Sequence, residues 1–260
     1  MGEKAVLFEK SGGIATITLN RPEAMNSMNQ ALVDDWIEAL ALAQKDSEVR
    51  AVVITGSGKA FCAGGDLFYL ASLKEPIAAR KFIEQAGTII NGIMGMDKPV
   101  IAMVNGVAAG AAFNIALACD IVFCAKSARF AQSFIKVGLV PDCGGLYLLS
   151  RVVGMHKAKE LMFTADLIDA DTALQLGIVN QVVEPEVLAA VTYAFAERMV
   201  NAAPVALGMI KKMINRSGNL DLESTLEFEA DMQTICMQTS DHQEGVKAFK
   251  EKRAPVFKGQ

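Results

Sequence analysis

Residues 60–66 read Ala60-Phe61-Cys62-Ala63-Gly64-Gly65-Asp66, a turn of small residues that directly follows the apolar run 51–55. A second turn of this kind, within residues 105–114, follows the apolar run 99–104 and reads Asn105-Gly106-Val107-Ala108-Ala109-Gly110-Ala111-Ala112-Phe113-Asn114. Each pattern is typical of a strand that enters a tight turn and then a helix, where backbone N–H groups can approach a ligand closely. Two such turns facing each other would form an oxyanion hole for a carbonyl that becomes an enolate. The pair therefore indicates an enzyme that acts on a thioester.

The composition limits the classes of protein to which this chain can belong. Its 260 residues, 52% of them hydrophobic, are sufficient for one main domain with a helical appendage. The net charge of −4 argues against a basic nucleic-acid-binding surface. Five cysteines occur without C-x-x-C spacing, which favours reduced cytosolic thiols over a disulfide framework or a zinc site.

Residues 99–119 form an uncharged run that is long enough to raise the question of a membrane helix. The run contains Asn105, Asn114 and two glycines, and it divides into a β-branched half and an Ala-rich half. This division predicts a strand, a turn and a buried helix rather than a membrane span. No signal peptide is expected, and the predicted location is cytoplasmic.

The order of apolar patterns predicts an α/β protein. Short β-type runs are expected at 5–9, 13–20, 52–55, 120–125, 129–132 and 179–183. Helical patterns are expected at 29–45, 76–96, 142–152, 156–164, 171–176, 204–215, 222–238 and 240–252. Strands that alternate with helices favour a parallel sheet with crossover helices, followed by a nearly all-helical C-terminal part.

An ordered set of motifs in this chain resembles the crotonase family, the enoyl-CoA hydratases and isomerases. The motifs cover almost the whole chain: Ile17-Thr18-Leu19-Asn20-Arg21-Pro22, the turn 60–67, Lys98-Pro99-Val100-Ile101-Ala102, Cys119-Asp120-Ile121, the run 138–145 and Glu251-Lys252-Arg253. The resemblance implies a spiral of ββα units in residues 1–195 and a helical trimerisation region in residues 196–260. It also implies homotrimers, often stacked as hexamers (dimers of trimers).

The resemblance also implies roles for individual residues. Ala63 and Ala111 would supply the two N–H groups of the oxyanion hole, and most relatives have glycine at the second of these positions. The resemblance implies an acyl-CoA substrate, of which coenzyme A is the part by which the enzyme binds it, and it implies no metal or redox cofactor. The residues expected to line the substrate site are Ala24, Gly64, Gly65, Asp66, Leu67 and Phe134, while Phe249 and Lys252 would close over the nucleotide, often from a neighbouring subunit.

Two carboxylates that the hydratases of this family use are missing from the chain. The matching positions hold Asn114 and Phe134, and neither an amide nor a phenyl ring can act as a general base. One carboxylate remains at a suitable place, Asp142, in a run that looks closest to the double-bond isomerases and ring-epoxide isomerases of the family. The predicted reaction is therefore a 1,3-proton shift on an enoyl-CoA with Asp142 as the base.

Several other interpretations stay open at this point. Asp142 and Asn114 could handle water together in a hydratase, Asp142 could act as a nucleophile, or the chain could be a non-catalytic scaffold or an RNA-binding member of the fold. Asp142 or Asp66 could instead cap a helix. We expect Asp120 to be a structural hydrogen-bonding partner and the two histidines, His156 and His242, to be surface residues. The sequence leaves the acyl group unspecified.

Overall fold

The computed structural model describes residues 4–260, and its main body is built on a sheet of six strands in the order β1-β2-β3-β5-β7-β10. β1 and β2 form an antiparallel hairpin, and the other neighbours in this sheet pair in parallel. The six strands span Val6–Ser11 (β1), Ile14–Leu19 (β2), Ala51–Gly56 (β3), Val100–Val104 (β5), Ile121–Ala125 (β7) and Gln181–Val183 (β10). The expected parallel sheet is therefore confirmed, with a hairpin at one edge.

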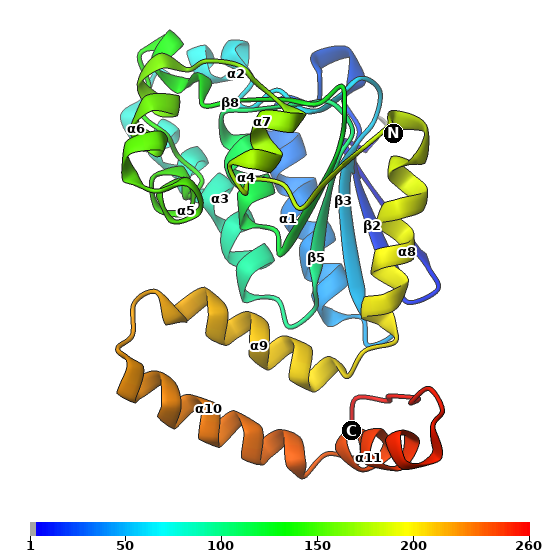
Figure 1. Ribbon diagram of the computed structural model, residues 1–260. Coiled ribbons are helices and arrows are strands. Elements are labelled where there is room, and N and C mark those ends of the chain that lie inside the picture. Colours follow the sequence, from blue (N-terminus) through cyan, green and yellow to red (C-terminus); the bar gives the residue numbers. More distant parts are fainter. Residues whose placement is uncertain (1–3) are drawn as a thin grey trace.

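β3 shows why the central strands are uninterrupted apolar runs. All six of its residues are buried, because helices cover both faces of the sheet. Side chains alternate between the faces, so Val52 and Ile54 pack on one side, and Val53 packs on the other side with α8 (Leu188–Val200). Figure 1 shows α8 lying along the sheet on the side away from α1 and α3.

A second sheet of short strands produces the ββα repeat that the family resemblance implies. Its order is β4-β6-β8-β9, with strands Ala60–Cys62, Val107–Ala109, Arg129–Ala131 and Ile168–Asp169. Each long strand from β3 onward is followed by one of these short strands and then by helix: β3 by β4, β5 by β6, and β7 by β8. The α/β crotonase fold predicted from the sequence is confirmed.

The helices of the main body cover this framework. Asn29 caps α1 by accepting a hydrogen bond from the Leu32 N–H at 3.0 Å, as its position before an apolar periodic run predicts. The helices span Gln30–Lys45 (α1), Leu67–Ser72 (α2), Pro76–Gly95 (α3), Ala111–Ala118 (α4), Gly145–Val153 (α5), Met155–Thr164 (α6) and Ala170–Gln175 (α7). Single 3-10 turns occur at Pro22–Ala24 (η1), Ser133–Val137 (η2) and Pro185–Val187 (η3).

The uncharged run 99–119 folds as the sequence predicts, into β5, β6 and the buried helix α4. Across residues 4–260, no helix has both the length and the apolar character needed to cross a membrane.

Three further helices follow α8 and lie at one end of the main body (Figure 1). They are α9 (Pro204–Ser217), α10 (Leu222–Met237) and α11 (Ser240–Glu251). The buried Lys211 on α9 pairs with the Asp120 carboxylate at 2.7 Å, and Asp120 also accepts the Val100 N–H at 2.7 Å. Asp120 therefore has the structural role expected of it. The boundary expected at residue 195 falls inside α8, which packs on the sheet to its end.

Candidate active site

A cavity of about 360 Å³ lies where the two small-residue turns meet α2, α3, η2 and the loop before α5. Its wall is mostly apolar, and Asp142 is the only carboxylate among the described residues that line it. Seven of the residues predicted for the site line the cavity: Ala63, Gly64, Gly65, Leu67, Ala111, Phe134 and Asp142.

The two turns are in direct contact, and glycine makes the contact possible. Gly64 has a φ of +93°, and a Cβ atom there would lie 2.7 Å from the carbonyl oxygen of Ala109 in the second turn. A side chain at this position would therefore separate the two turns. Gly64 also accepts a hydrogen bond from the Met28 N–H at 2.7 Å, which holds the first turn against the segment before α1.

The first turn offers a different N–H from the one that we expected. The Ala63 N–H donates to the Met25 carbonyl at 3.0 Å, so it is already used within the fold. The expectation that Ala63 supplies an oxyanion-hole N–H is therefore corrected. The Gly65 N–H, two residues on, has no acceptor within residues 4–260, and Gly65 lines the cavity.

The second turn offers its N–H at the start of a helix. Gly110, with a φ of +55°, reverses the chain so that α4 begins at Ala111. Ala111 is the first residue of the helix, where N–H groups have no intrahelical acceptor, and it lines the cavity. The partial positive charge of the helix N-terminus adds to the attraction for a negatively charged oxygen. Gly65 and Ala111 thus place two N–H groups, neither with an acceptor within residues 4–260, on turns that touch each other.

Asp142 lies in the loop before α5 and does not cap this helix. The predicted helix start at Asp142 is wrong, because Cys143 and Gly144 both have positive φ and delay α5 to Gly145. The Asp142 Oδ1 atom is buried and has no hydrogen-bond partner in the described part of the chain. Burial raises the pKa of this carboxyl above its ordinary value. A carboxylate of this kind is suited to exchanging protons with a substrate.

Asn114, which the family resemblance matches to a glutamate of the hydratases, does not face the cavity. Its side chain is 0% exposed and uses both ends of the amide. Nδ2 donates to the backbone oxygen of Asp142 at 2.8 Å, and Oδ1 accepts from Gln132 Nε2 at 2.7 Å. Because the side chain is wholly buried and each end of the amide has a protein partner, it is not directed at a water molecule in the cavity.

Four of the predicted substrate-site residues lie outside the cavity wall. Asp66 caps α2 by accepting the N–H groups of Phe68 and Tyr69, and it pairs with Arg21 at 3.2 Å, which confirms the capping interpretation. Ala24 is in η1. Phe249 on α11 is 85% exposed, and Lys252 ends that helix, at the opposite end of the molecule from α2 (Figure 1). Within one chain, Phe249 and Lys252 are therefore not brought to the cavity.

Sequence reasoning missed the part of the cavity wall that α3 supplies. Ala79, Phe82, Ile83 and Ala86 line the cavity from α3, together with Leu73 at the end of α2. Their spacing gives the same apolar helical face as core residues, so no signal in the sequence separates the two roles.

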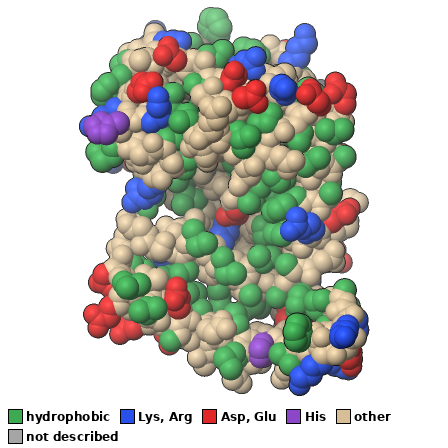
Figure 2. All heavy atoms as spheres, in the orientation of Figure 1, with side chains coloured by type: hydrophobic (Ala, Val, Ile, Leu, Met, Phe, Trp, Pro, Cys, Tyr) green, Lys and Arg blue, Asp and Glu red, His purple; other side chains and the backbone are tan. Residues whose placement is uncertain are grey.

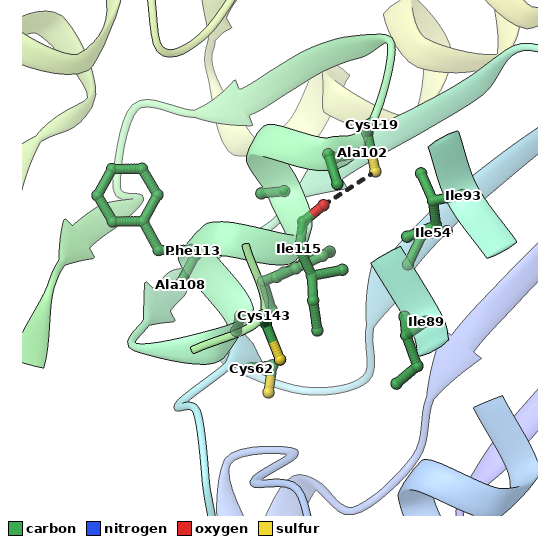
Figure 3. Packing of buried hydrophobic residues seen from close by; sticks show 14 of the residues in the cluster. Ile54, Cys62, Ile89, Ile93, Ala102, Ala108, Phe113, Ile115, Cys119 and Cys143 are labelled. Atoms are coloured by element: carbon green, nitrogen blue, oxygen red, sulfur yellow. Dashed lines mark hydrogen bonds between the residues drawn. The ribbon is translucent and has the colours of Figure 1, made fainter. Parts of the chain in front are cut away.

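Two cysteines lie beside the first turn and the loop that carries Asp142. Figure 3 shows Cys62, at the end of β4, and Cys143, next to Asp142, with their side chains directed toward one another. Burial raises the pKa of both thiols, so they are protonated near neutral pH and are poor nucleophiles.

The fold and the two contacting turns point to a class of enzymes, which the comparison with known families identifies. The profile of the enoyl-CoA hydratase/isomerase family matches residues 9–260. The chain belongs to this family, the crotonase family, and is an enzyme of hydratase or isomerase type that acts on acyl-CoA thioesters.

Individual relatives carry both kinds of name. A short-chain-enoyl-CoA hydratase from Clostridium acetobutylicum is 40% identical over 249 residues, which cover 95% of each chain. A 1,2-epoxyphenylacetyl-CoA isomerase from Escherichia coli is 37% identical over 257 residues, which cover 98% of each chain. The crystal structure of an enoyl-CoA hydratase from Bacillus anthracis superposes with a TM-score of 0.95 at 32% identity, covering 98% of this chain and 100% of that one. Names of both reaction types thus occur at similar levels of identity.

Proposed function

We propose that this protein is an enoyl-CoA isomerase that moves a double bond by a 1,3-proton shift, with Asp142 as the base. The observation that carries the proposal is the single carboxylate in the cavity wall, with a buried, unpartnered Oδ1 atom and no second acid or base of the hydratase type within the described lining. One base is sufficient for a proton shift, because the group that accepts the proton also returns it. This would place the chain in the aspartate-dependent isomerase branch, which includes the ring-epoxide phenylacetyl-CoA isomerases.

The reaction would proceed through an enolate held by Gly65 and Ala111. Asp142 takes a proton from C2 of a 3-enoyl thioester, and the electron pair of that C–H bond delocalises onto the thioester oxygen. The two N–H groups donate to this oxygen, and each such donor is typically worth about a hundredfold to a thousandfold in rate. The protonated Asp142 then returns the proton to C4, and the double bond becomes conjugated with the carbonyl.

Hydration of a 2-enoyl-CoA is the second candidate, and the name of the Clostridium acetobutylicum relative favours it. In this case Asp142 would have to activate water without a second carboxylate. The engaged amide of Asn114 supports isomerisation over this alternative.

The test is ultraviolet absorbance after the protein is added to a 3-enoyl-CoA. We expect a rise from the newly conjugated thioester and a loss of that rise in Asp142→Asn, which keeps the shape but removes the base. The raised pKa of Asp142 predicts that activity increases with pH through a value above the ordinary aspartate pKa of 3.8, because only the ionised form accepts a proton. The absence of a rise, with a 2-enoyl-CoA instead losing its conjugated band, would assign the protein as a hydratase.

The same proposal includes the assembly and the location. We propose a homotrimer or a dimer of trimers, in which α9, α10 and α11 of the predicted region 196–260 form the helical oligomerisation region. The body predicted as residues 1–195, which extends to the end of α8, carries the site. Phe249 and Lys252 would then reach the coenzyme A site of a neighbouring subunit, while Ala24 and Asp66 would lie near that site in their own chain. The cytoplasmic location stays a prediction from the sequence.

A further inference from the structure

We infer that Asn114 is a positioning residue: its amide fixes the loop that carries Asp142, and Gln132 fixes the orientation of that amide. This inference rests on the proposed function, because it assigns Asn114 a role that is exerted through the base. The amide connects three segments: α4, the segment between β8 and η2, and the loop before α5.

The first step of the argument is burial. Asn114 is wholly buried and Gln132 is 1% exposed, so neither side chain can exchange its partner for bulk water. A buried amide that lost a partner would cost the desolvation of an unpaired polar group. The Asn114 amide is therefore held in one arrangement, in which Oδ1 accepts from Gln132 Nε2 and Nδ2 donates to the Asp142 backbone oxygen. The other end of the Gln132 amide, Oε1, is buried without a partner in the described part of the chain.

The second step is the conformation of the loop that Asn114 holds. Cys143 has a φ of +45° and is followed by Gly144 at +74°, and a left-handed non-glycine residue persists only where its surroundings hold it. The Asp142 backbone oxygen accepts from Asn114 and also from the Gly145 N–H at 3.0 Å. These two bonds fix the peptide that follows Asp142, and so the direction in which its carboxylate leaves the backbone.

The third step is the close packing of α5 on this amide. A Cβ atom at Gly145 would lie 2.2 Å from Asn114 Nδ2, so α5 can begin here only with glycine. Asn114 also lies one helical turn after Ala111 on α4. One short helix thus sets the position of a proposed oxyanion donor and that of the proposed base relative to each other.

The test is Asn114→Leu, which keeps the approximate shape and removes both polar ends. A misplacement of about 1 Å in a catalytic group can cost about a hundredfold in rate, so we expect kcat to fall by about that factor. The KM for the 3-enoyl-CoA and the calorimetric affinity for a saturated acyl-CoA should stay unchanged. Asn215→Leu is the matched control, because the Asn215 amide also donates to a backbone oxygen, that of Met94 at 3.1 Å, but on α9. The control should keep the wild-type kcat.

A double variant separates positioning from a merely structural role. If Asn114 acts through Asp142, then Asn114→Leu should cause no further loss of kcat in an Asp142→Asn background. A further loss there, or weaker binding of the saturated acyl-CoA, would overturn the inference. If Asn114→Leu does not fold, Gln132→Met takes its place, because it frees the Asn114 amide to rotate. This variant should lower kcat in the same non-additive way, and an unchanged kcat would overturn the inference. Activity at the wild-type level in Asp142→Asn alone would instead refute the proposed function, whereas the double-variant comparison uses the low residual rate of that variant.

Discussion

Two helices of equal length, α1 in the main body and α10 among the C-terminal helices, differ in how many of their side chains are buried. Both have 16 residues, but α1 buries six side chains against the sheet and α3, whereas α10 has no buried residue. Leu226 on α10 is 54% exposed, and Figure 2 shows hydrophobic side chains at the surface of the C-terminal helices, next to acidic ones. The face of α1 is therefore completed within one chain, whereas α10 leaves apolar surface of the kind that other protein surfaces cover, as the main body also does at Phe68 and Ile77.

The largest effect on activity is expected from a change in the main body, which contains α1, that leaves the C-terminal helices α9, α10 and α11 unchanged. Ala111→Pro removes the N–H of the first residue of α4, a position where proline fits a helix. We expect kcat to fall by about a hundredfold to a thousandfold, the value of one oxyanion donor, with no change in molecular mass in solution. Ala111→Gly, which keeps the N–H, is the control and should retain most of the activity. Equal activity in the two variants would contradict the assignment of Ala111.

An intermediate effect, on the oligomeric state, is expected from a charge placed on the C-terminal helix α10. Leu226→Asp should shift the protein to a smaller species in sedimentation velocity and remove the dependence of its Tm on protein concentration, because the exposed face of α10 would no longer associate. Val187→Asp, in η3 of the main body and 46% exposed, is the matched control and should leave the mass unchanged. A wild-type protein that sediments as a single chain would contradict the proposed assembly.

The smallest effect concerns the exposed ion pairs that hold the end of the chain. The hydrogen bonds from Arg253 and then from the Val256 N–H lower the pKa of Glu244 to about 2 from 4.5. Because the folded-state pKa is depressed, this contribution to stability is present above pH 4.5 and is lost as the pH falls toward 2. The Val256 amide, which donates to Glu244 at 2.9 Å, should lose its protection from hydrogen exchange over that range, after correction for the intrinsic rate. Arg253→Gln should move the loss to higher pH, and protection that stays constant down to pH 2 would contradict the pairing.

Much of the fold could be predicted because its signals are local. The Asn29 cap, the apolar runs of β3 and β5 and the Gly/Ala turns each depend on neighbouring residues, and the structure has them where the sequence indicates.

The errors in the site have a common cause, which is long-range contact. Whether Ala63 or Gly65 presents a free N–H depends on Met25 and Met28, about forty residues earlier in the chain. The start of α5 depends on two left-handed residues that the amide of Asn114 supports from another helix. Neither of these contacts produces a periodic pattern of apolar residues, so neither can be predicted from the sequence in this way.

The order of the elements also bears on synthesis of the chain. All strands of both sheets are complete at Val183, and α8 closes the last sheet face at Val200. At about 5–20 residues per second, residues 201–260 would follow over roughly 3–12 s. The body that carries the site can therefore fold while α9, α10 and α11 are still being translated. The exposed apolar side chains of these helices are the last to leave the ribosome, so they are exposed for the shortest time before another chain can cover them.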